Sequence, residues 1–187
     1  DSWQPAEKTE CRNSLNIPLD KFIIGSFQRD TEGGTKNPKL EKGPDLFCDY
    51  VEKIKDEKDV HVLLGGWRRE YVIDRLQNAN IPFTFFEKVS LDKLRIMYGA
   101  CDLYVVASRF EGGPQAILEA SAMKVPIISR DVGIANNVLE PRCVIDIPKE
   151  SFIPGEDSVE KNYQNVQDYS IVLHKNSYLQ IFESVLK

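Results

Sequence analysis

The stretch LYVVASRFEGGPQAILEA, residues 103–120, decides the fold, because an apolar run, a glycine pair and a helix-forming run follow one another directly. Residues 103–107 are apolar and rich in β-prone side chains, which predicts a buried strand. Gly112 and Gly113 then let the backbone approach a ligand closely. Pro114 suits the first position of a helix, because its missing N–H leaves no helical hydrogen bond unmade there. The stretch therefore predicts a strand, a glycine turn and the start of a helix.

Two carboxylates, Glu111 and Glu119, lie eight positions apart around the glycine pair. The unpaired N–H groups of a helix start, together with the helix dipole, favour phosphate or sugar oxygens nearby. We expect Glu111 at the mouth of such a site and Glu119 about one and a half turns into the helix, where it can accept hydrogen bonds from a vicinal diol. The alternative is that Glu111 only complements the dipole and that Glu119 is a solvated helix position. These residues alone leave both interpretations open.

The composition is that of one globular domain. A chain of 187 residues can bury about 70% of its unfolded surface, so it needs no disulfide or metal to fold. Hydrophobic residues at 42% and charged residues at 28% argue against disorder. A net charge of −5 gives no general field for nucleic acid, so we expect no nucleic-acid partner, and local basic groups must hold any anionic ligand.

Cysteine usage and hydropathy point to a reducing compartment. The four cysteines are far apart with no paired spacing, which predicts reduced thiols. No apolar run reaches the length of a membrane span, and no signal-peptide pattern stands at the N-terminus. We therefore expect a cytoplasmic protein. Because the first residue is Asp1 and not methionine, we expect the chain to be a piece of a longer protein.

Apolar runs alternate with helical patterns along the whole chain. Most runs are continuously apolar, which is typical of strands buried on both faces of a parallel sheet. The pattern predicts an α/β, Rossmann-like doubly wound parallel sheet of about six strands with helices on both faces. Ligands in such folds bind beyond the carboxyl ends of the strands. The expected strands are residues 22–27, 60–64, 81–86, 101–107, 125–129 and, at one edge, 143–145.

The last part of the chain is expected to be helical. We divide the chain into a Rossmann-like ligand-binding domain, residues 1–156, and a helical tail, residues 157–187, with a break near Ser170 or Lys175. An amphipathic tail of this kind can cover the sheet of its own domain.

A long polar segment, residues 28–41, follows the first expected strand, and its length predicts a functional loop, a mobile loop or both. Arg29 begins this loop and Lys42 follows it, and a parallel sheet puts both on the same edge as Glu111. Two cations there suit a diphosphate. The alternative is that both are solvated loop charges, which are common. Lys36, Lys39 and Arg68 are weaker candidates.

Several kinds of chemistry find little support. His61 and His174 have no second histidine or cysteine at ligand spacing, so we expect no metal site. The chain has no G-x-S-x-G, Walker or G-x-G-x-x-G pattern. The aromatic residues of the third expected strand suit a core, and only the adjoining Glu87 and Lys88 are placed to reach a ligand.

Several motifs together resemble a known family. The run from Glu111 to Pro114, Glu119-Ala120, the preceding residues 101–105 and the following residues 124–128 are similar to the C-terminal, donor-binding domain of GT-B retaining glycosyltransferases of the family 4 type. The resemblance covers roughly residues 15–139 and keeps the order of the family's motifs, which makes it more specific than any single motif.

The resemblance implies a role for each candidate residue. Glu111 is similar to the glutamate that contacts the donor sugar, and Glu119 to the glutamate that holds the ribose. Arg29 and Lys42 resemble the basic pair that stabilises the departing nucleoside diphosphate. The remaining implied donor-binding residues are Gly112, Gly113 and Pro114 beside the sugar or phosphate, and Glu87 and Lys88 beside the base.

The resemblance also implies the substrate and a partner. The donor is a UDP-, GDP- or ADP-linked sugar of hexose type, no cofactor or metal is needed, and an acceptor-binding N-terminal domain is absent from this chain. The terminal helices of the family pack back toward that domain. The resemblance leaves open whether that domain attaches the protein peripherally to a membrane. Two departures are a longer loop, where Lys36 or Lys39 could replace Arg29, and Asn136-Asn137, where the family often has a glutamate. Alternatives are a noncatalytic nucleotide-sugar sensor and a nucleotide-sugar epimerase.

Overall fold

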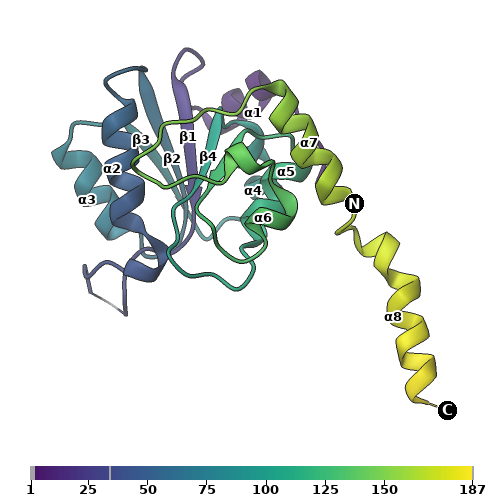
Figure 1. Ribbon diagram of the computed structural model, residues 1–187. Helices are drawn as coiled ribbons and strands as arrows, with labels where there is room; N and C mark the ends of the chain where they lie inside the picture. The colour runs from purple at the N-terminus through teal and green to yellow at the C-terminus, as the bar shows by residue number, and fades with distance from the viewer. Residues whose placement is uncertain (1–2, 34, 187) are drawn as a thin grey trace.

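A computed structural model describes residues 3–33 and 35–186 of the chain. Its centre is a five-stranded, entirely parallel sheet in the order β3-β2-β1-β4-β5 (Figure 1). Successive strands move outward from β1 to β3, and the chain then returns to the other side of β1 to form β4 and β5. The neighbouring strands β1 and β4 therefore form the topological switch point, which is where open α/β sheets bind ligands. The strands are β1 Phe22–Phe27, β2 Val60–Gly66, β3 Phe83–Glu87, β4 Leu103–Val106 and β5 Ile127–Ser129.

Helices cover both faces of the sheet, as the alternating pattern predicted. Figure 1 shows α2 and α3 on one side, and α4, α5 and α6 on the other. Alternate strand residues feed the two cores: Ile23 packs with the α4 and α5 side chains, and Ile24 packs with those of α2 and α3. The helices are α1 Lys8–Leu15, α2 Pro44–Ile54, α3 Glu70–Asn78, α4 Leu91–Gly99, α5 Gln115–Ala122, α6 Ala135–Val138, α7 Glu156–Gln167 and α8 Ile171–Val185.

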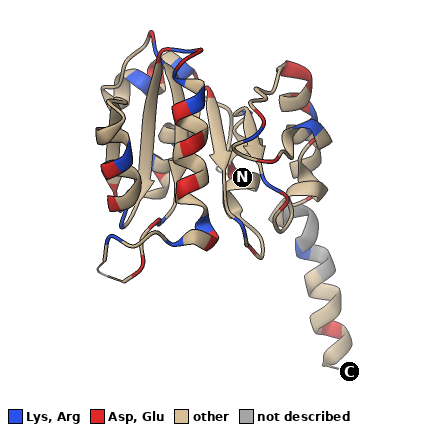
Figure 2. Ribbon diagram, turned by 60° about the vertical axis from the view of Figure 1, so that its left-hand side comes forward, with Lys and Arg blue, Asp and Glu red and all other residues tan. Residues whose placement is uncertain are grey.

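Charge is kept out of the strands. Apart from Glu87 at the end of β3, the strands carry no Lys, Arg, Asp or Glu, and Figure 2 shows the charged residues on helices and loops. Such strands are continuous apolar runs because both faces are buried. The predicted α/β, Rossmann-like fold is thus confirmed.

The prediction of a sixth strand at residues 143–145 is wrong. Val144 forms a single parallel bridge with Ser129, and the Ile145 amide donates to the Ser129 carbonyl over 2.9 Å. A 3-10 turn, Pro141–Cys143, runs directly into this segment, and β5 itself ends at Ser129. The pairing therefore has no room for more than one residue. Helix α5 also begins one residue later than predicted, with Pro114 as its N-cap.

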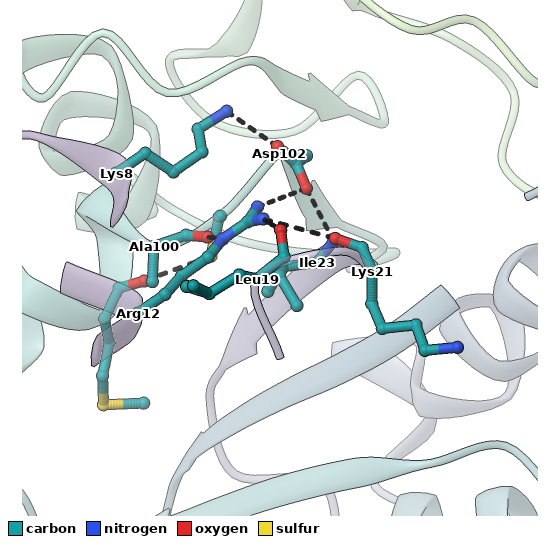
Figure 3. Close-up of polar contacts among 9 residues, drawn as sticks. Lys8, Arg12, Leu19, Lys21, Ile23, Ala100 and Asp102 are labelled. Carbon is teal, nitrogen blue, oxygen red and sulfur yellow. Dashed lines mark hydrogen bonds and ion pairs between the residues drawn. The ribbon is translucent and has the colours of Figure 1, made fainter. Parts of the chain in front are cut away.

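At the edge of the sheet where the parallel strands begin, a buried arginine, Arg12, fixes α1 (Figure 3). The Arg12 guanidinium donates to the carbonyls of Ala100 and Leu19, each over 3.0 Å, and to Asp102 over 2.5 Å. Asp102 also accepts from Lys8 Nζ over 2.7 Å and from the Ile23 amide over 2.8 Å. This network joins α1 to the starts of β1 and β4.

The tail is helical with a break at residues 168–170, close to the predicted Ser170. Helix α7 packs on α5 and α6 and buries Asn162 and Val166. Helix α8 extends away from the body of the domain (Figure 1), with Ile181 and Phe182 exposed. The division at residue 156 stays a prediction. Within the described part of the chain, none of the helices combines the length and the apolar character that crossing a bilayer requires.

Candidate functional site

A cleft of about 350 Å³ opens at the carboxyl ends of β1 and β4, at the topological switch point. Its walls come from the two strand ends, the segment before α2, helix α4, and the glycine loop with the start of α5. The lining residues are Phe27, Gln28, Lys42, Leu94, Tyr98, Tyr104, Val105, Val106, Glu111, Gly113, Pro114, Gln115, Ala116 and Glu119. Both glutamates of the quoted stretch therefore face one cleft.

An ion pair stands at the mouth of the cleft. Lys42 Nζ is paired with Glu111 Oε1, and the Ser108 hydroxyl donates to the same oxygen over 3.2 Å. The Lys42 side chain is 27% exposed and that of Glu111 is 17% exposed. The pair is thus only partly shielded, and an anionic or hydroxyl-bearing ligand in the cleft can reach both groups.

The two loops that carry this pair are fastened together. Arg109 forms a two-pronged ion pair with Asp45, with N···O distances of 2.7 and 2.6 Å, and donates to the Leu40 carbonyl over 2.8 Å. Its own amide donates to the Glu41 carbonyl over 2.8 Å. These contacts fix the segment before α2 against the loop after β4. Arg109 lowers the pKa of the Asp45 carboxyl, chiefly through this hydrogen bond.

Gly43 makes that close approach possible. Its φ is +62°, and a Cβ at this position would lie 1.9 Å from the carbonyl oxygen of Ala107. Only glycine fits both the backbone conformation and the space. The position of Lys42, one residue earlier, therefore depends on a glycine that touches the end of β4.

Glu119 lies deeper in the cleft and is held by a tyrosine. The Tyr98 hydroxyl donates to Glu119 Oε2 over 2.9 Å. Burial raises the pKa of Glu119, and the hydrogen bond from Tyr98 opposes that rise. Burial also raises the pKa of Tyr98 well above its usual value, so this hydroxyl is a donor at all physiological pH values.

The start of α5 provides the remaining wall. Gly113 and Pro114 line the cleft, whereas Gly112 is exposed and lies against Gly133, whose Cβ would be 2.9 Å from the Gly112 carbonyl oxygen. The positive end of the α5 dipole therefore faces the cleft.

Four predicted residues lie outside the cleft lining. One is Gly112, described above, and another is Arg29, which is exposed in the segment after β1. Glu87 and Lys88 are exposed at the end of β3, which β2 separates from β1, and Lys88 Nζ lies 5.4 Å from the centre of the Trp67 ring. The structure thus brings together Lys42, Glu111 and Glu119 with Gly113 and Pro114, and the roles of all the predicted residues stay predictions.

The alternative cations of the long loop are engaged elsewhere. Lys36 pairs with Asp74 over 2.7 Å, and Lys39 pairs with Glu41 over 3.0 Å. The loop itself is fixed by an antiparallel bridge between Thr31 and Pro38. These contacts tie the described parts of the segment to α3 and to each other.

Arg69 is a residue that sequence reasoning missed. Its fully buried guanidinium donates to Asp30 Oδ2 over 2.8 Å and to the carbonyls of Ser26 and Gly65 over 2.6 and 2.8 Å. Burial raises the pKa of Asp30 although Arg69 opposes the rise. The pair ties the long loop to the ends of β1 and β2. Its only sequence signal is an arginine five residues after the predicted strand 60–64, which is indistinguishable from a solvated charge.

A scan against family models decides the classification. The model described as Glycosyl transferases group 1 matches residues 34–159, which is more than half of the chain. The chain belongs to this glycosyltransferase family. The matched range contains Lys42, Glu111 and Glu119, so these three cleft residues lie within the family's domain.

Curated relatives of the group 1 domain are bacterial glycosyltransferases. The mannosyltransferase LpsB of lipopolysaccharide core biosynthesis from Rhizobium meliloti is 26% identical over 69% of this chain and 37% of its own length. The protein named "Putative teichuronic acid biosynthesis glycosyltransferase TuaC" from Bacillus subtilis is 29% identical. The match covers 67% of this chain and 29% of TuaC. The chain thus spans about a third of the curated relatives it matches.

Solved structures share the fold. Anabaena HepE in complex with UDP-glucose superimposes with a TM-score of 0.74 at 17% identity, over 97% of this chain and 54% of HepE. The C-terminal domain of the group 1 protein LpcC from Francisella tularensis gives a TM-score of 0.64 at 20% identity, over 94% of this chain and 95% of that domain. The fold of the group 1 domain is therefore the Rossmann-like domain of GT-B proteins.

Proposed function

We propose that this chain is the donor-binding domain of a retaining glycosyltransferase of the family 4 type, which transfers a hexose-type sugar from a nucleoside diphosphate to an acceptor. The observation that carries the proposal is the cleft at the β1/β4 switch point, lined by Lys42, Glu111 and Glu119 and facing the positive end of α5. A cation, two carboxylates and a helix start are the groups that a diphosphate bearing a sugar and a ribose needs.

In this proposal the bound donor separates the Lys42–Glu111 ion pair at the cleft mouth, and each side chain contacts a different part of the donor. Lys42, with Arg29 as a second cation from the loop after β1, binds the diphosphate and stabilises the charge that develops as the glycosidic bond breaks. Glu111 then accepts hydrogen bonds from the sugar hydroxyls. The contact between Lys42 and Glu111 in the free protein keeps each charge paired until the donor replaces it.

The nucleoside end is assigned to the deeper part of the cleft and beyond it. Glu119 accepts from the ribose hydroxyls, Gly112, Gly113 and Pro114 lie beside the sugar or phosphate, and Glu87 and Lys88 lie beside the base. The structural neighbour HepE was solved in complex with UDP-glucose, which supports a nucleotide-sugar ligand. UDP is therefore the first nucleotide to test, before GDP and ADP.

The acceptor side is assigned to a second domain. Because the chain matches about half of HepE and about a third of LpsB, we propose an N-terminal acceptor-binding domain outside this chain. The exposed apolar side chains of α8, among them Ile181, Phe182 and Val185, suit packing against that domain. A cytoplasmic location belongs to the same proposal.

The test is a ligand screen with matched variants. UDP-, GDP- and ADP-sugars are added to the protein that carries this domain, and a matched donor should raise the melting temperature in proportion to its affinity. Lys42→Ala should abolish that rise. Lys55→Ala, at the C-cap of α2 and far from the cleft mouth, should preserve it.

The outcomes separate the transferase from its alternatives. Donor binding with transfer to an acceptor supports the proposal, and donor binding without transfer or hydrolysis identifies a noncatalytic sensor. Interconversion of two sugar epimers on the nucleotide identifies an epimerase. No stabilisation by any nucleotide sugar contradicts all three functions.

A further inference from the structure

One hydrogen bond in the cleft joins α4 to α5, two helices on the same face of the sheet. Tyr98 belongs to the last turn of α4 and Glu119 to the second turn of α5, and the tyrosine hydroxyl donates to Glu119 Oε2 over 2.9 Å. Tyr98 is 1% exposed, and both residues line the cleft. The carboxylate that points into the ligand space is therefore anchored from behind by a fully buried donor.

The position of the Tyr98 hydroxyl is fixed by aromatic packing on three sides. The Tyr98 ring meets Phe27 edge-on at 4.9 Å between centroids and Trp3 edge-on at 5.8 Å, and Tyr104 packs at 5.0 Å with a tilt of 47°. Edge-to-face contacts of this kind restrict the ring more than area burial alone. A fixed ring holds its hydroxyl in one place, so the hydrogen bond selects one orientation of the Glu119 carboxylate.

The bond leaves most of the carboxylate available to a ligand. An ionised carboxylate offers about four acceptor positions, and Tyr98 occupies one of them on Oε2. The two hydroxyls of a ribose can then be accepted by the remaining positions. Because burial disfavours the charged carboxylate, donation by Tyr98 also helps to keep Glu119 ionised.

We propose that Tyr98 is a positioning residue that orients Glu119 for the 2′- and 3′-hydroxyls of the donor nucleotide, and thereby makes the cleft selective for ribonucleotides. The inference rests on the proposed donor-binding function. It adds a residue from α4 that is not among the candidate donor contacts, and it assigns a specific consequence to the loss of one hydroxyl group.

The experiment compares nucleotides that differ only in the hydroxyls in question. UDP, GDP and ADP are each paired with the 2′,3′-dideoxy nucleotide of the same base, and affinities are measured by calorimetry on the protein that carries this domain. Tyr98→Phe should weaken binding of the preferred ribonucleotide about 3- to 10-fold, which is the size of effect expected for the loss of one ordinary hydrogen bond. Binding of its dideoxy partner should change less than about twofold.

The matched control deletes a buried tyrosine hydroxyl away from the cleft. Tyr50 of α2 is fully buried in the core on the other face of the sheet, and its hydroxyl has no hydrogen-bond partner among the described residues, so Tyr50→Phe removes the same group without touching Glu119. This variant should keep the wild-type ratio of ribonucleotide to dideoxynucleotide affinity. A ratio that falls as far in Tyr50→Phe as in Tyr98→Phe would assign the effect to general loosening of the fold and overturn the inference.

Glu119→Ala separates this inference from the function on which it rests. If Glu119→Ala loses the preference for the ribonucleotide and Tyr98→Phe keeps it, Glu119 holds the ribose and only the positioning role is wrong. If the wild type and Glu119→Ala show the same ratio, the ribose role itself is wrong. Equal weakening of both nucleotides by Tyr98→Phe also overturns the positioning role, because a merely structural residue has that effect.

Discussion

The two edges of the sheet each hold a carboxylate paired with a cation, and the two pairs differ in how completely their hydrogen bonds are used. At the N-terminal edge, Arg12 donates to two kinds of acceptor, backbone carbonyls and Asp102, and Asp102 accepts from Arg12, Lys8 and the Ile23 amide (Figure 3). At the C-terminal edge, Lys42 and Glu111 meet at the mouth of a cleft.

The difference separates a structural pair from a pair that can bind. A buried ion pair stabilises only when further hydrogen bonds satisfy its remaining atoms, and the Arg12–Asp102 network meets that condition. The Lys42–Glu111 pair instead keeps hydrogen-bonding positions that face a cavity. The following predictions test this contrast by removing one member at each edge.

The largest effect is expected from Asp102→Ala. Arg12, with its side chain 7% exposed, would then be left as a buried charge without its carboxylate. Breaking such a pair typically costs about 3–5 kcal/mol, and we expect a loss of this size in urea unfolding. Glu111→Ala at the other edge should cost less than about 1 kcal/mol, because that pair is partly exposed and weak. Equal losses at both edges would break the contrast.

The second effect concerns activity at the cleft. Glu111→Gln keeps the size of the side chain and removes its charge, so we expect stability within about 0.5 kcal/mol of the wild type. Transfer should fall roughly 10²- to 10³-fold, as for other groups that stabilise a transition state electrostatically. Steady-state rates with the matched donor and acceptor measure the change. An activity within about threefold of the wild type would remove Glu111 from the proposed mechanism.

Much of this fold was predictable because its strands are continuous apolar runs and most of them are buried on both faces. The runs that became β1, β2, β4 and β5 are buried over most of their length, and the run that became β3, at the edge of the sheet, is partly exposed. The predicted edge strand at residues 143–145 failed because a short apolar run does not reveal that a turn precedes it. The length of the run was therefore a better guide than its place in the sheet, because the longer runs that became the outer strands β3 and β5 were predicted.

The site was only partly predictable, for a similar reason. The order of motifs was enough to place Lys42, Glu111 and Glu119 at one edge, because parallel strands end together. It could not show that Arg29 is exposed outside the cleft lining, since that depends on how the long loop is folded. Tyr98 was not singled out from the sequence, because its contact with Glu119 joins two separate helices and leaves no local pattern.

A third, smaller effect is expected from Arg109→Lys, which tests how the two halves of the cleft mouth are joined. Lysine cannot reproduce the two parallel hydrogen bonds to Asp45 or the additional bond to the Leu40 carbonyl. We expect a loss of about 1–2 kcal/mol in stability. Donor affinity should also fall, because Lys42 and Glu111 lose their common support, and calorimetry should detect this.

The same ion pair predicts a pH dependence. Because Arg109 lowers the pKa of Asp45 in the folded protein, the pair stabilises the protein above the unfolded-state pKa of Asp, about 3.9, and its contribution is lost as the pH falls through the lower folded pKa. The stability difference between the wild type and Asp45→Asn should therefore shrink in acid. A difference that stays constant from pH 7 to pH 3 contradicts this account.

The smallest effect should have the opposite sign and comes from Glu119→Gln. Burial raises the pKa of Glu119, so the folded state holds its proton more tightly than the unfolded state does. This preference stabilises the protein below the unfolded-state pKa, about 4.3, and is lost as the pH rises through the folded pKa. At neutral pH the ionised, partly buried carboxylate therefore opposes folding relative to a neutral amide, which can still accept from Tyr98. Glu119→Gln should raise the melting temperature by about 1–3 °C at pH 7.5, and this gain should vanish near pH 3.5. The same variant should bind the ribonucleotide more weakly than the wild type at pH 7.5. A carboxylate whose removal stabilises the fold and weakens the ligand is retained for binding, and destabilisation by Glu119→Gln at pH 7.5 would place Glu119 in the same structural class as Asp102.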